Sequence, residues 1–154
     1  MKPIEIKTVF LAKETPQEIC AAILDTERWT EFRGYSFLPG IKNASYDLKK
    51  PEVTGSRIKV ICDDNSTYIE EIIKWDISNR IALKFKEFDA PLKYLATHFI
   101  EMCEFRIVSG KTEITRTVTM YPKNMLGWLL LIPVSRVMKK ALEKHMEGIY
   151  TSGK

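Results

Sequence analysis

From Gly40 to Tyr121 the chain repeats one pattern, in which short stretches of alternating polar and apolar residues are separated by turn-forming residues. The stretches lie near residues 41–48, 55–62, 66–75, 80–88, 95–107 and 112–121. A period of two predicts half-buried strands, and connections such as DDNS, DISN and SGKT are short. Because short connections join strands that run in opposite directions, the sequence predicts an antiparallel meander. Pro91 cannot donate a backbone hydrogen bond, so we expect a loop or edge segment over residues 88–97.

A strand and two short helices are expected before the meander. Residues 4–11 begin with polar and apolar residues in alternation and predict the strand. The sequence TPQE predicts a helix start, because Thr15 can accept from an early backbone N–H and Glu18 occupies the acidic position of a capping box. Asp25 is the expected cap of a second short helix over residues 25–32.

The closing segment, residues 125–149, is patterned as an amphipathic helix. At about 100° per residue, its inner face carries Leu131, Val134, Met138, Leu142, His145 and Ile149. The opposite face becomes charged after Pro133, which we expect to mark either the start of the helix or a kink. The sequence therefore predicts a helix that lies on a sheet. The apolar run 125–134 is about half as long as the ~20 residues that a membrane-spanning helix needs.

Leu129 and Ile132 project toward the side of this helix that becomes charged, so they lack an evident apolar partner. Packing under the segment 88–97 is the expected explanation. A homodimer contact is one alternative. Peripheral contact with a membrane is another, because Lys139, Lys140 and Lys144 follow on the same helix and would face anionic headgroups.

Charge and cysteine usage argue against several classes of function. The net charge is +4, and Lys and Glu alternate through most segments without forming a basic face, so nucleic-acid binding is not expected. Three widely spaced cysteines predict buried free thiols of a reducing compartment, and no ligand spacing predicts a metal site or another cofactor. The N-terminus lacks the apolar stretch of a signal peptide, so we expect a cytoplasmic protein.

The length suits a single domain, which we assign to residues 1–150, with residues 151–154 as a short tail. The order of the expected elements resembles the START and Bet v 1 type of helix-grip fold, in the SRPBCC superfamily that includes polyketide cyclase-like and aromatase-like proteins. The resemblance rests on TPQEICAAILDTERWTEF, VTGSRIKV, YIEEIIKW followed by IALKF, and the terminal helix. It implies an α+β fold in which a curved, seven-stranded antiparallel sheet wraps the long C-terminal helix, with two short helices after the first strand. It also implies a cavity that binds an apolar or amphipathic small molecule, whereas the family has no shared catalytic motif.

Strand alternation identifies Glu71, Glu101 and Arg116 as candidate charges inside such a cavity. Their expected neighbours on the inner face are Ile69, Ile73 and Trp75 for the first, Phe99, Cys103, Phe105 and Ile107 for the second, and Ile114, Val118 and Met120 for the third. An interior charge is costly unless it is paired, hydrated or bound to a ligand. Exposure at strand ends or a structural ion pair is the alternative explanation. We expect Glu101 and Arg116 to lie about four residues out of register, roughly 13 Å along the strand, so a direct pair is not assured.

The expected ligand-binding residues are Glu71, Trp75, Phe85, Phe99, Glu101, Phe105, Arg116, Met138, Leu142 and His145. Their aromatic members could equally fill a core, and His145 could be an ordinary hydrogen-bonded core histidine. We therefore expect binding, transport or sensing of a hydrophobic or amphipathic small molecule. A cyclase-like or aromatase-like enzyme that uses an interior carboxylate is the first alternative, and a partner-binding or membrane-contacting regulator is the second.

Overall fold

A computed structural model describes residues 1–150 and Gly153; residues 151, 152 and 154 of the expected tail lie outside the described residues. The long strands are β1 (Ile4–Ala12), β4 (Ile41–Leu48), β5 (Arg57–Cys62), β6 (Thr67–Asp76), β7 (Arg80–Lys86), β8 (Ala96–Val108) and β9 (Lys111–Pro122). The helices are α1 (Pro16–Leu24), the 3-10 helix η1 (Thr26–Glu31), α2 (Leu92–Leu95) and α3 (Met125–Ile149). A short hairpin, β2 (Gly34–Tyr35) and β3 (Leu38–Pro39), follows η1.

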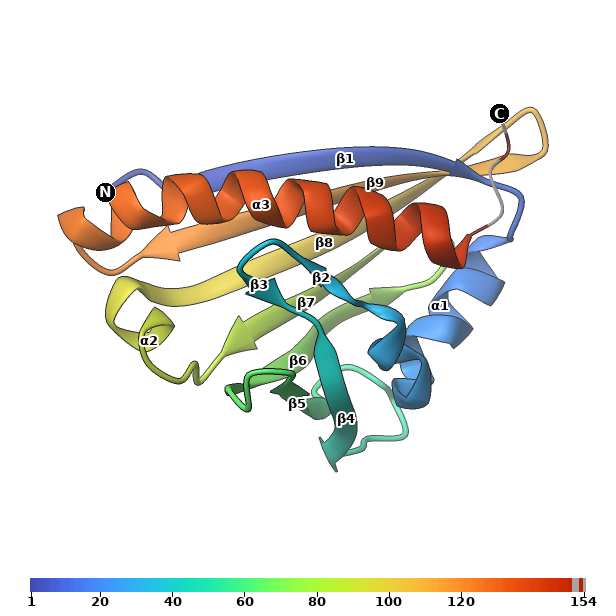
Figure 1. Cartoon of the computed structure of the whole chain (residues 1–154). Helices are drawn as coiled ribbons and strands as arrows, with labels where there is room; N and C mark the ends of the chain where they lie inside the picture. Colours follow the sequence, from blue (N-terminus) through green and yellow to red (C-terminus); the bar gives the residue numbers. More distant parts are fainter. Residues whose placement is uncertain (151–152, 154) are drawn as a thin grey trace.

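Within the described part of the chain, the long strands form one seven-stranded antiparallel sheet in the order β1-β9-β8-β7-β6-β5-β4. The sheet curves around α3, and α2 and the β2–β3 hairpin lie beside this helix (Figure 1). Register shifts interrupt the β4–β5, β6–β7 and β8–β9 pairs, and such bulges bend the strands that contain them. The predicted α+β architecture is confirmed.

The two short helices begin as their caps predict. Thr15 Oγ1 accepts from the backbone N–H of Glu18 at 3.2 Å, and Asp25 Oδ1 accepts from the backbone N–H of Glu27 at 3.3 Å. Trp29, in the second helix, donates its indole N–H to the carbonyl of Ile23 at 2.8 Å, which holds η1 against α1. Local sequence therefore fixes this corner of the molecule.

Two elements were not expected. The segment 88–97, expected as a loop or edge, contains the single-turn helix α2 and the start of β8. The β2–β3 hairpin is a separate two-stranded sheet in which Tyr35 pairs with Leu38. Both elements contact α3 (Figure 1).

A tight turn fixes the pairing of β8 with β9. Ser109 and Gly110 have positive φ angles of 52° and 78°, which a two-residue hairpin needs, and glycine adopts such angles without steric cost. The register places Glu101 opposite Val118, so Arg116 lies two residues away. The expected offset of four residues is wrong.

A bulge in β6 reverses the expected direction of side chains before Ile73. Trp75 lies opposite Ile81, as an inward residue should, but the register shifts between Ile72 and Lys74. Counting back across this shift makes Glu70 inward and Glu71 outward, and Glu71 lies opposite Lys84. The expected inward positions of Glu71, Ile69 and Ile73 are therefore wrong. Ile107, expected inward on β8, is also exposed, because the pairing of β7 with β8 ends at Glu104 and leaves Ile107 without a neighbouring strand on that side.

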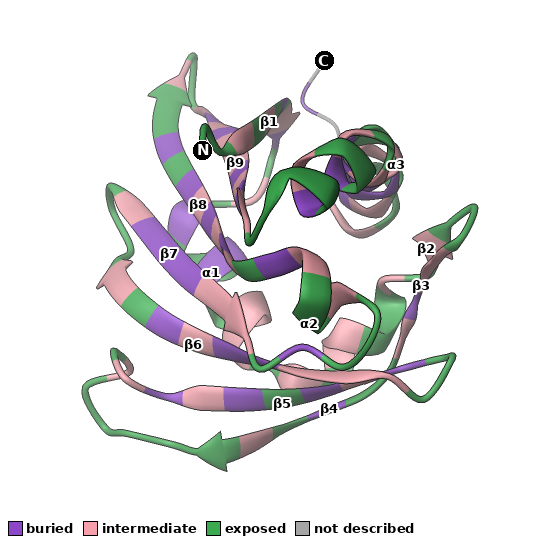
Figure 2. Cartoon of the chain, turned by 90° about the vertical axis from the view of Figure 1, so that its left-hand side faces the viewer, coloured by how far each residue is buried: buried purple, intermediate pink, exposed green. Residues whose placement is uncertain are grey.

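Helix α3 is continuous from Met125, so Pro133 does not mark its start. Asn124 Oδ1 caps the helix by accepting from the backbone N–H of Gly127 at 2.8 Å. Pro133 lacks an N–H for the carbonyl of Leu129, but both residues are exposed and water can replace that donor. Figure 2 shows buried residues on the side of α3 that faces the sheet. Among the described residues, no helix combines the length and apolar character that a bilayer crossing requires.

Candidate ligand-binding cavity

A cavity of about 360 Å³ lies between the concave face of the sheet and α3. Strands β5 to β9 contribute one wall, and α3 contributes the opposite wall. Helices α1 and η1 and the β2–β3 hairpin close one side (Figure 1). Phe37 of the hairpin and Pro91 before α2 line the cavity and are also exposed, so the cavity reaches the surface between these two segments.

One part of the cavity is lined by an aromatic wall, by which we mean Tyr68, Phe85, Phe88 and Phe99. The rings of Tyr68 and Phe85 are stacked with centroids 5.6 Å apart, and those of Phe88 and Phe99 are tilted at 4.9 Å. Aromatic pairs at such distances stabilise one another by about 0.5–1.5 kcal/mol beyond simple burial. Mutual contact therefore keeps these rings on the wall and out of the open space.

The facing wall is aliphatic. Val134, Met138 and Leu142 of α3 line it, at the spacing that places side chains on one face of a helix. Phe32, which follows η1, extends the apolar lining toward His145, and their rings meet edge to face at 5.3 Å. An apolar molecule between the two walls would therefore contact hydrocarbon on both sides.

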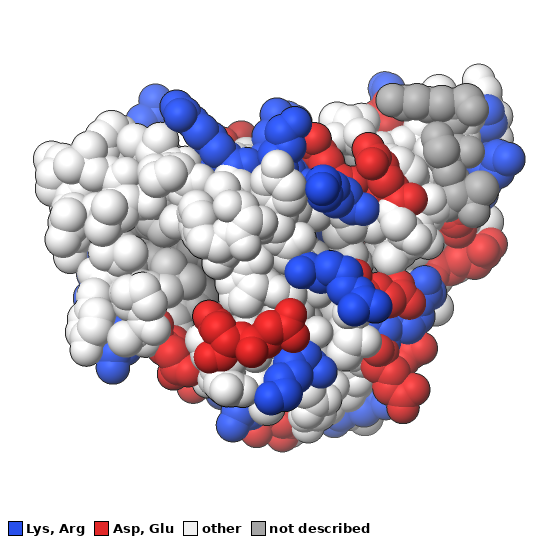
Figure 3. Space-filling view, viewed as in Figure 1, with Lys and Arg blue, Asp and Glu red and all other residues white. Residues whose placement is uncertain are grey.

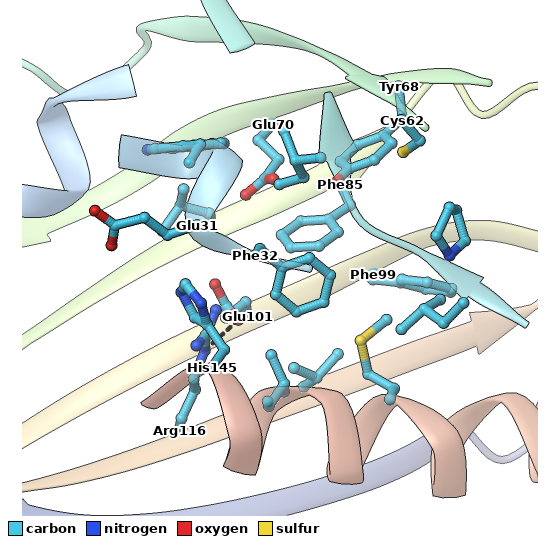
Figure 4. Close-up of a pocket in the computed structure, with 18 of the residues that line it drawn as sticks. Glu31, Phe32, Cys62, Tyr68, Glu70, Phe85, Phe99, Glu101, Arg116 and His145 are labelled. Atoms are coloured by element: carbon cyan, nitrogen blue, oxygen red, sulfur yellow. Dashed lines mark hydrogen bonds and ion pairs between the residues drawn. The ribbon is translucent and has the colours of Figure 1, made fainter. Parts of the chain in front are cut away.

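The opposite part of the cavity carries a polar end, which consists of Glu70, Glu101, Arg116 and His145. Figure 4 shows Glu101, Arg116 and His145 grouped together, away from Phe85 and Phe99. Arg116 Nε donates to Glu101 Oε2 at 2.6 Å, and the two side chains are only 17% and 7% exposed. Burial alone would lower the pKa of Arg116, but the Glu101 carboxylate raises it above its ordinary value. The arginine thus keeps its charge, and a partner cancels that charge.

Glu70 is the second buried carboxyl of the polar end. It projects inward from β6, opposite Phe85, and is almost completely buried. Burial, and then the negative charge of Glu101, hold the pKa of Glu70 well above its usual range, while Arg116 opposes this rise less strongly. A carboxyl that keeps its proton can donate one hydrogen bond into the cavity.

His145 approaches the polar end from α3. Burial, and then the charge of Arg116, lower the pKa of His145 to about 3, so the ring is neutral at physiological pH. Its Nδ1 is buried and has no hydrogen-bond partner among the described residues. A neutral ring nitrogen of this kind can donate or accept, depending on the tautomer.

Seven of the ten expected ligand-binding residues line the cavity: Phe85, Phe99, Glu101, Arg116, Met138, Leu142 and His145. Glu71 does not, because it lies on the other face of the sheet, where it pairs with Lys86. Trp75 and Phe105 pack in the core beside the cavity. A ligand-binding role for the seven residues stays a prediction.

The sequence reasoning missed Glu70, Tyr68, Phe88 and Phe32, which also line the cavity. Glu70 and Tyr68 were missed because the bulge in β6 inverts the alternation. The neighbouring Ile72 and Ile73 are a visible sign of that bulge, since two apolar residues in succession break a period of two.

No protein-family model and no curated protein matches the sequence. Solved structures do match. A START superfamily protein from Mycobacterium smegmatis superposes with a TM-score of 0.70 at 11% identity, with 94% of each chain covered. The Bet v 1-like protein Ara h 8.0201 gives a TM-score of 0.63 at 14% identity, with 93% of this chain and 97% of that chain covered. The major latex-like protein 151 from Panax ginseng gives 0.60 at 13% identity, with 91% and 97% covered.

The chain has the START/Bet v 1 helix-grip fold. At these identities the likeness concerns the fold and names no ligand. Three or more His, Cys, Asp or Glu side chains at metal-binding distance are not found among residues 1–150 and Gly153. The cavity is lined mostly by apolar side chains, with a few hydrogen-bonding groups at one end.

Proposed function

We propose that the protein binds a hydrophobic or amphipathic small molecule in the helix-grip cavity. The observation that carries the proposal is an interior space of about 360 Å³ that is lined mostly by apolar side chains and left unfilled by them. Sites for small molecules have volumes of roughly 300–1,000 Å³ and combine apolar walls with a few polar groups. This cavity lies at the lower end of that range, so it suits a compact ligand.

The two parts of the cavity orient such a ligand. Its apolar portion packs between the aromatic wall and the aliphatic residues of α3, where burial stabilises it by about 25 cal/mol per Å². Its polar group reaches the polar end, where the protonated carboxyl of Glu70 can donate a hydrogen bond. Because Arg116 is already paired with Glu101, the polar end favours an uncharged polar group such as a hydroxyl or a carbonyl.

Native mass spectrometry of freshly purified protein tests the proposal. We expect either a retained molecule or uptake of a compound from a mixed set of lipids and aromatic alcohols. Met138→Trp, which introduces a larger side chain into the cavity, should lower uptake at least about tenfold. Lys140→Trp, on the exposed side of the same helix, is the matched control and should bind like the wild type. Failure of the wild type to bind any compound of the set would contradict the proposal.

Glu70 favours a second function, proton-transfer catalysis. Of the two carboxyls that the sequence suggested for this role, Glu71 lies outside the cavity and Glu101 is held by Arg116. Glu70 faces the cavity with a raised pKa, which is the property of a general acid or base that works near neutral pH. Exchange of the α-hydrogens of 2-acetylnaphthalene in D₂O, followed by mass spectrometry, tests this role. Exchange that equals the buffer rate, or that is unchanged in Glu70→Gln, would remove it.

A further inference from the structure

An apolar surface is uncovered at the end of the molecule where α3 begins. Five side chains on it are between 45% and 64% exposed: Tyr94 of α2, and Met125, Leu126, Leu129 and Leu130 of α3. We call these residues the α2–α3 patch. The α3 members are spaced by four residues in two pairs, so they form one continuous surface over the first turns of the helix. Figure 3 shows this end as a broad uncharged region.

Local packing does not cover the patch. We expected Leu129 and Ile132 to pack under the segment 88–97, but Leu129 is exposed and Ile132 is only half-buried. Soluble proteins seldom leave a contiguous group of large apolar side chains in water without a binding partner for it. We therefore expect another molecule to cover the patch.

The charges at the rim of the patch are positive. Lys93 Nζ lies 5.0 Å from the ring centre of Tyr94, and Lys123 Nζ donates to the backbone carbonyl of Lys93 at 3.2 Å. The sequence has no acidic residue in 90–100 or in 123–135. Apolar side chains bordered by lysines, without acids between them, match the interface of a bilayer that contains anionic lipids.

The patch is held as one rigid unit. Asn124, which caps α3, also donates its side-chain N–H to the carbonyl of Tyr94 at 3.2 Å. A Cβ atom at Gly127 would lie 2.1 Å from the carbonyl oxygen of Leu95, so α2 and α3 meet in close backbone contact. Just before Tyr94, Pro91 and Leu92 line the cavity. The patch and the opening of the cavity therefore belong to the same end of the molecule.

We propose that the α2–α3 patch binds the surface of a membrane that contains anionic lipids. Its apolar side chains enter the interface, and Lys93 and Lys123 meet the headgroups. A second copy of the chain fits less well, because a two-fold interface brings the same patch of both copies together and would oppose their lysines without acids to pair them. Binding in this orientation brings the cavity opening close to the lipid surface.

Vesicle co-sedimentation tests the proposal with phosphatidylcholine alone and with phosphatidylcholine that contains phosphatidylglycerol. We expect binding to the anionic vesicles at low salt and much weaker binding to the neutral ones. Lys93→Gln/Lys123→Gln should lower the partition constant about 25-fold, because each lysine near the surface contributes roughly a fivefold factor. Leu126→Gln/Leu130→Gln should abolish binding to both kinds of vesicle.

Lys139→Gln/Lys140→Gln removes the same charge from an exposed part of α3 outside the patch and serves as the control. It should retain nearly all binding. Wild-type protein that stays in solution with anionic vesicles, or equal losses in the two lysine variants, would overturn the proposal. So would a dimer in analytical ultracentrifugation that Leu126→Gln/Leu130→Gln dissociates. Uptake of small molecules without vesicles reports on the cavity alone, so the two proposals fail independently.

Discussion

Arg116 and Glu101 lie diagonally across the β8–β9 pair, two residues out of direct register, and their side chains meet at 2.6 Å inside the cavity. Diagonal neighbours on one face of a sheet are within reach of long side chains. The pair is nearly buried, so each charge depends on the other for its compensation. This relationship decides both the stability of the polar end and the kind of ligand that it accepts.

Glu101→Gln should lower the free energy of unfolding by about 3–5 kcal/mol, because it leaves the Arg116 charge buried without a counter-charge. Urea unfolding followed by circular dichroism measures this change. Glu101→Leu/Arg116→Met removes both charges and should cost clearly less than the single substitution. A loss below about 1 kcal/mol in Glu101→Gln would show that water already solvates Arg116 and that the pair is not structurally important.

Glu70 and Glu71 are neighbours in sequence on opposite faces of the sheet, so they give a matched pair for pH experiments. The pKa of Glu70 is 4.5 in an unfolded chain and well above that value in the folded state. Just above pH 4.5, the folded protein therefore keeps a proton on Glu70 that the unfolded chain loses. The folded state then binds more protons than the unfolded state, so this group reduces stability as pH rises, until the pH passes its folded pKa. Relative to the wild type, Glu70→Gln should therefore gain stability in urea unfolding as the pH rises above 4.5.

Glu71 should show the opposite trend. Its hydrogen bond with Lys86 lowers its pKa, so it contributes stability above the unfolded pKa and loses that contribution as the pH falls. Glu71→Gln should cost at most about 1 kcal/mol at neutral pH, since the pair is near the surface, and nothing measurable in acid. Parallel pH profiles for the two variants would mean that both carboxyls share one environment, contrary to the bulge in β6.

The two histidines provide a direct test of the polar end. His145 should remain neutral down to about pH 3, because burial and Arg116 oppose its protonation. His98, whose pKa is lowered by partial burial and by Lys84, should titrate at a higher pH than His145. NMR spectra of the imidazole signals resolve both titrations. A His145 signal that shifts above pH 6 would place its ring in water and outside the cavity.

Depression of the His145 pKa also has a defined effect on stability. Between about pH 3 and pH 6.5 the unfolded chain holds a proton on this ring that the folded chain lacks, so the free energy of unfolding rises with pH across that window. His145→Phe should flatten this part of the profile. The control, His98→Phe, should change it much less.

Much of the fold was predictable because it follows from periodicity and local caps. The expected strand 41–48 coincides with β4, and Thr15 and Asp25 cap the helices that their positions indicated. The direction of Glu71 was not predictable from alternation alone, because a bulge adds one residue without changing the composition of the strand. Periodicity left Pro133 open as either the start of α3 or a kink, because a proline removes one backbone donor; the Asn124 cap, which begins the helix at Met125, excludes the first alternative.

The cavity itself was predicted through the family resemblance and not through the residues. The alternation of polar and apolar residues along a strand predicts which side chains face inward. It does not predict whether other side chains fill the space on that inner face. Phe85 and Phe105 both point inward, yet the first lines the cavity and the second packs in the core. That difference depends on contacts between segments far apart in the sequence, such as Phe32 and His145.

The charges of the polar end cancel one another, so the cavity should bind uncharged ligands more tightly than charged ones. The paired Arg116 has no free charge to offer, so a charged ligand group would enter without compensation, which costs several kcal/mol. At neutral pH, 2-naphthol should bind at least about tenfold more tightly than 2-naphthoate or 2-naphthylmethylamine, as measured by fluorescence titration. In Glu101→Gln the arginine loses its partner, so the preference should move toward 2-naphthoate. Tighter binding of the carboxylate by the wild-type protein would mean that Arg116 leaves Glu101 when a ligand arrives.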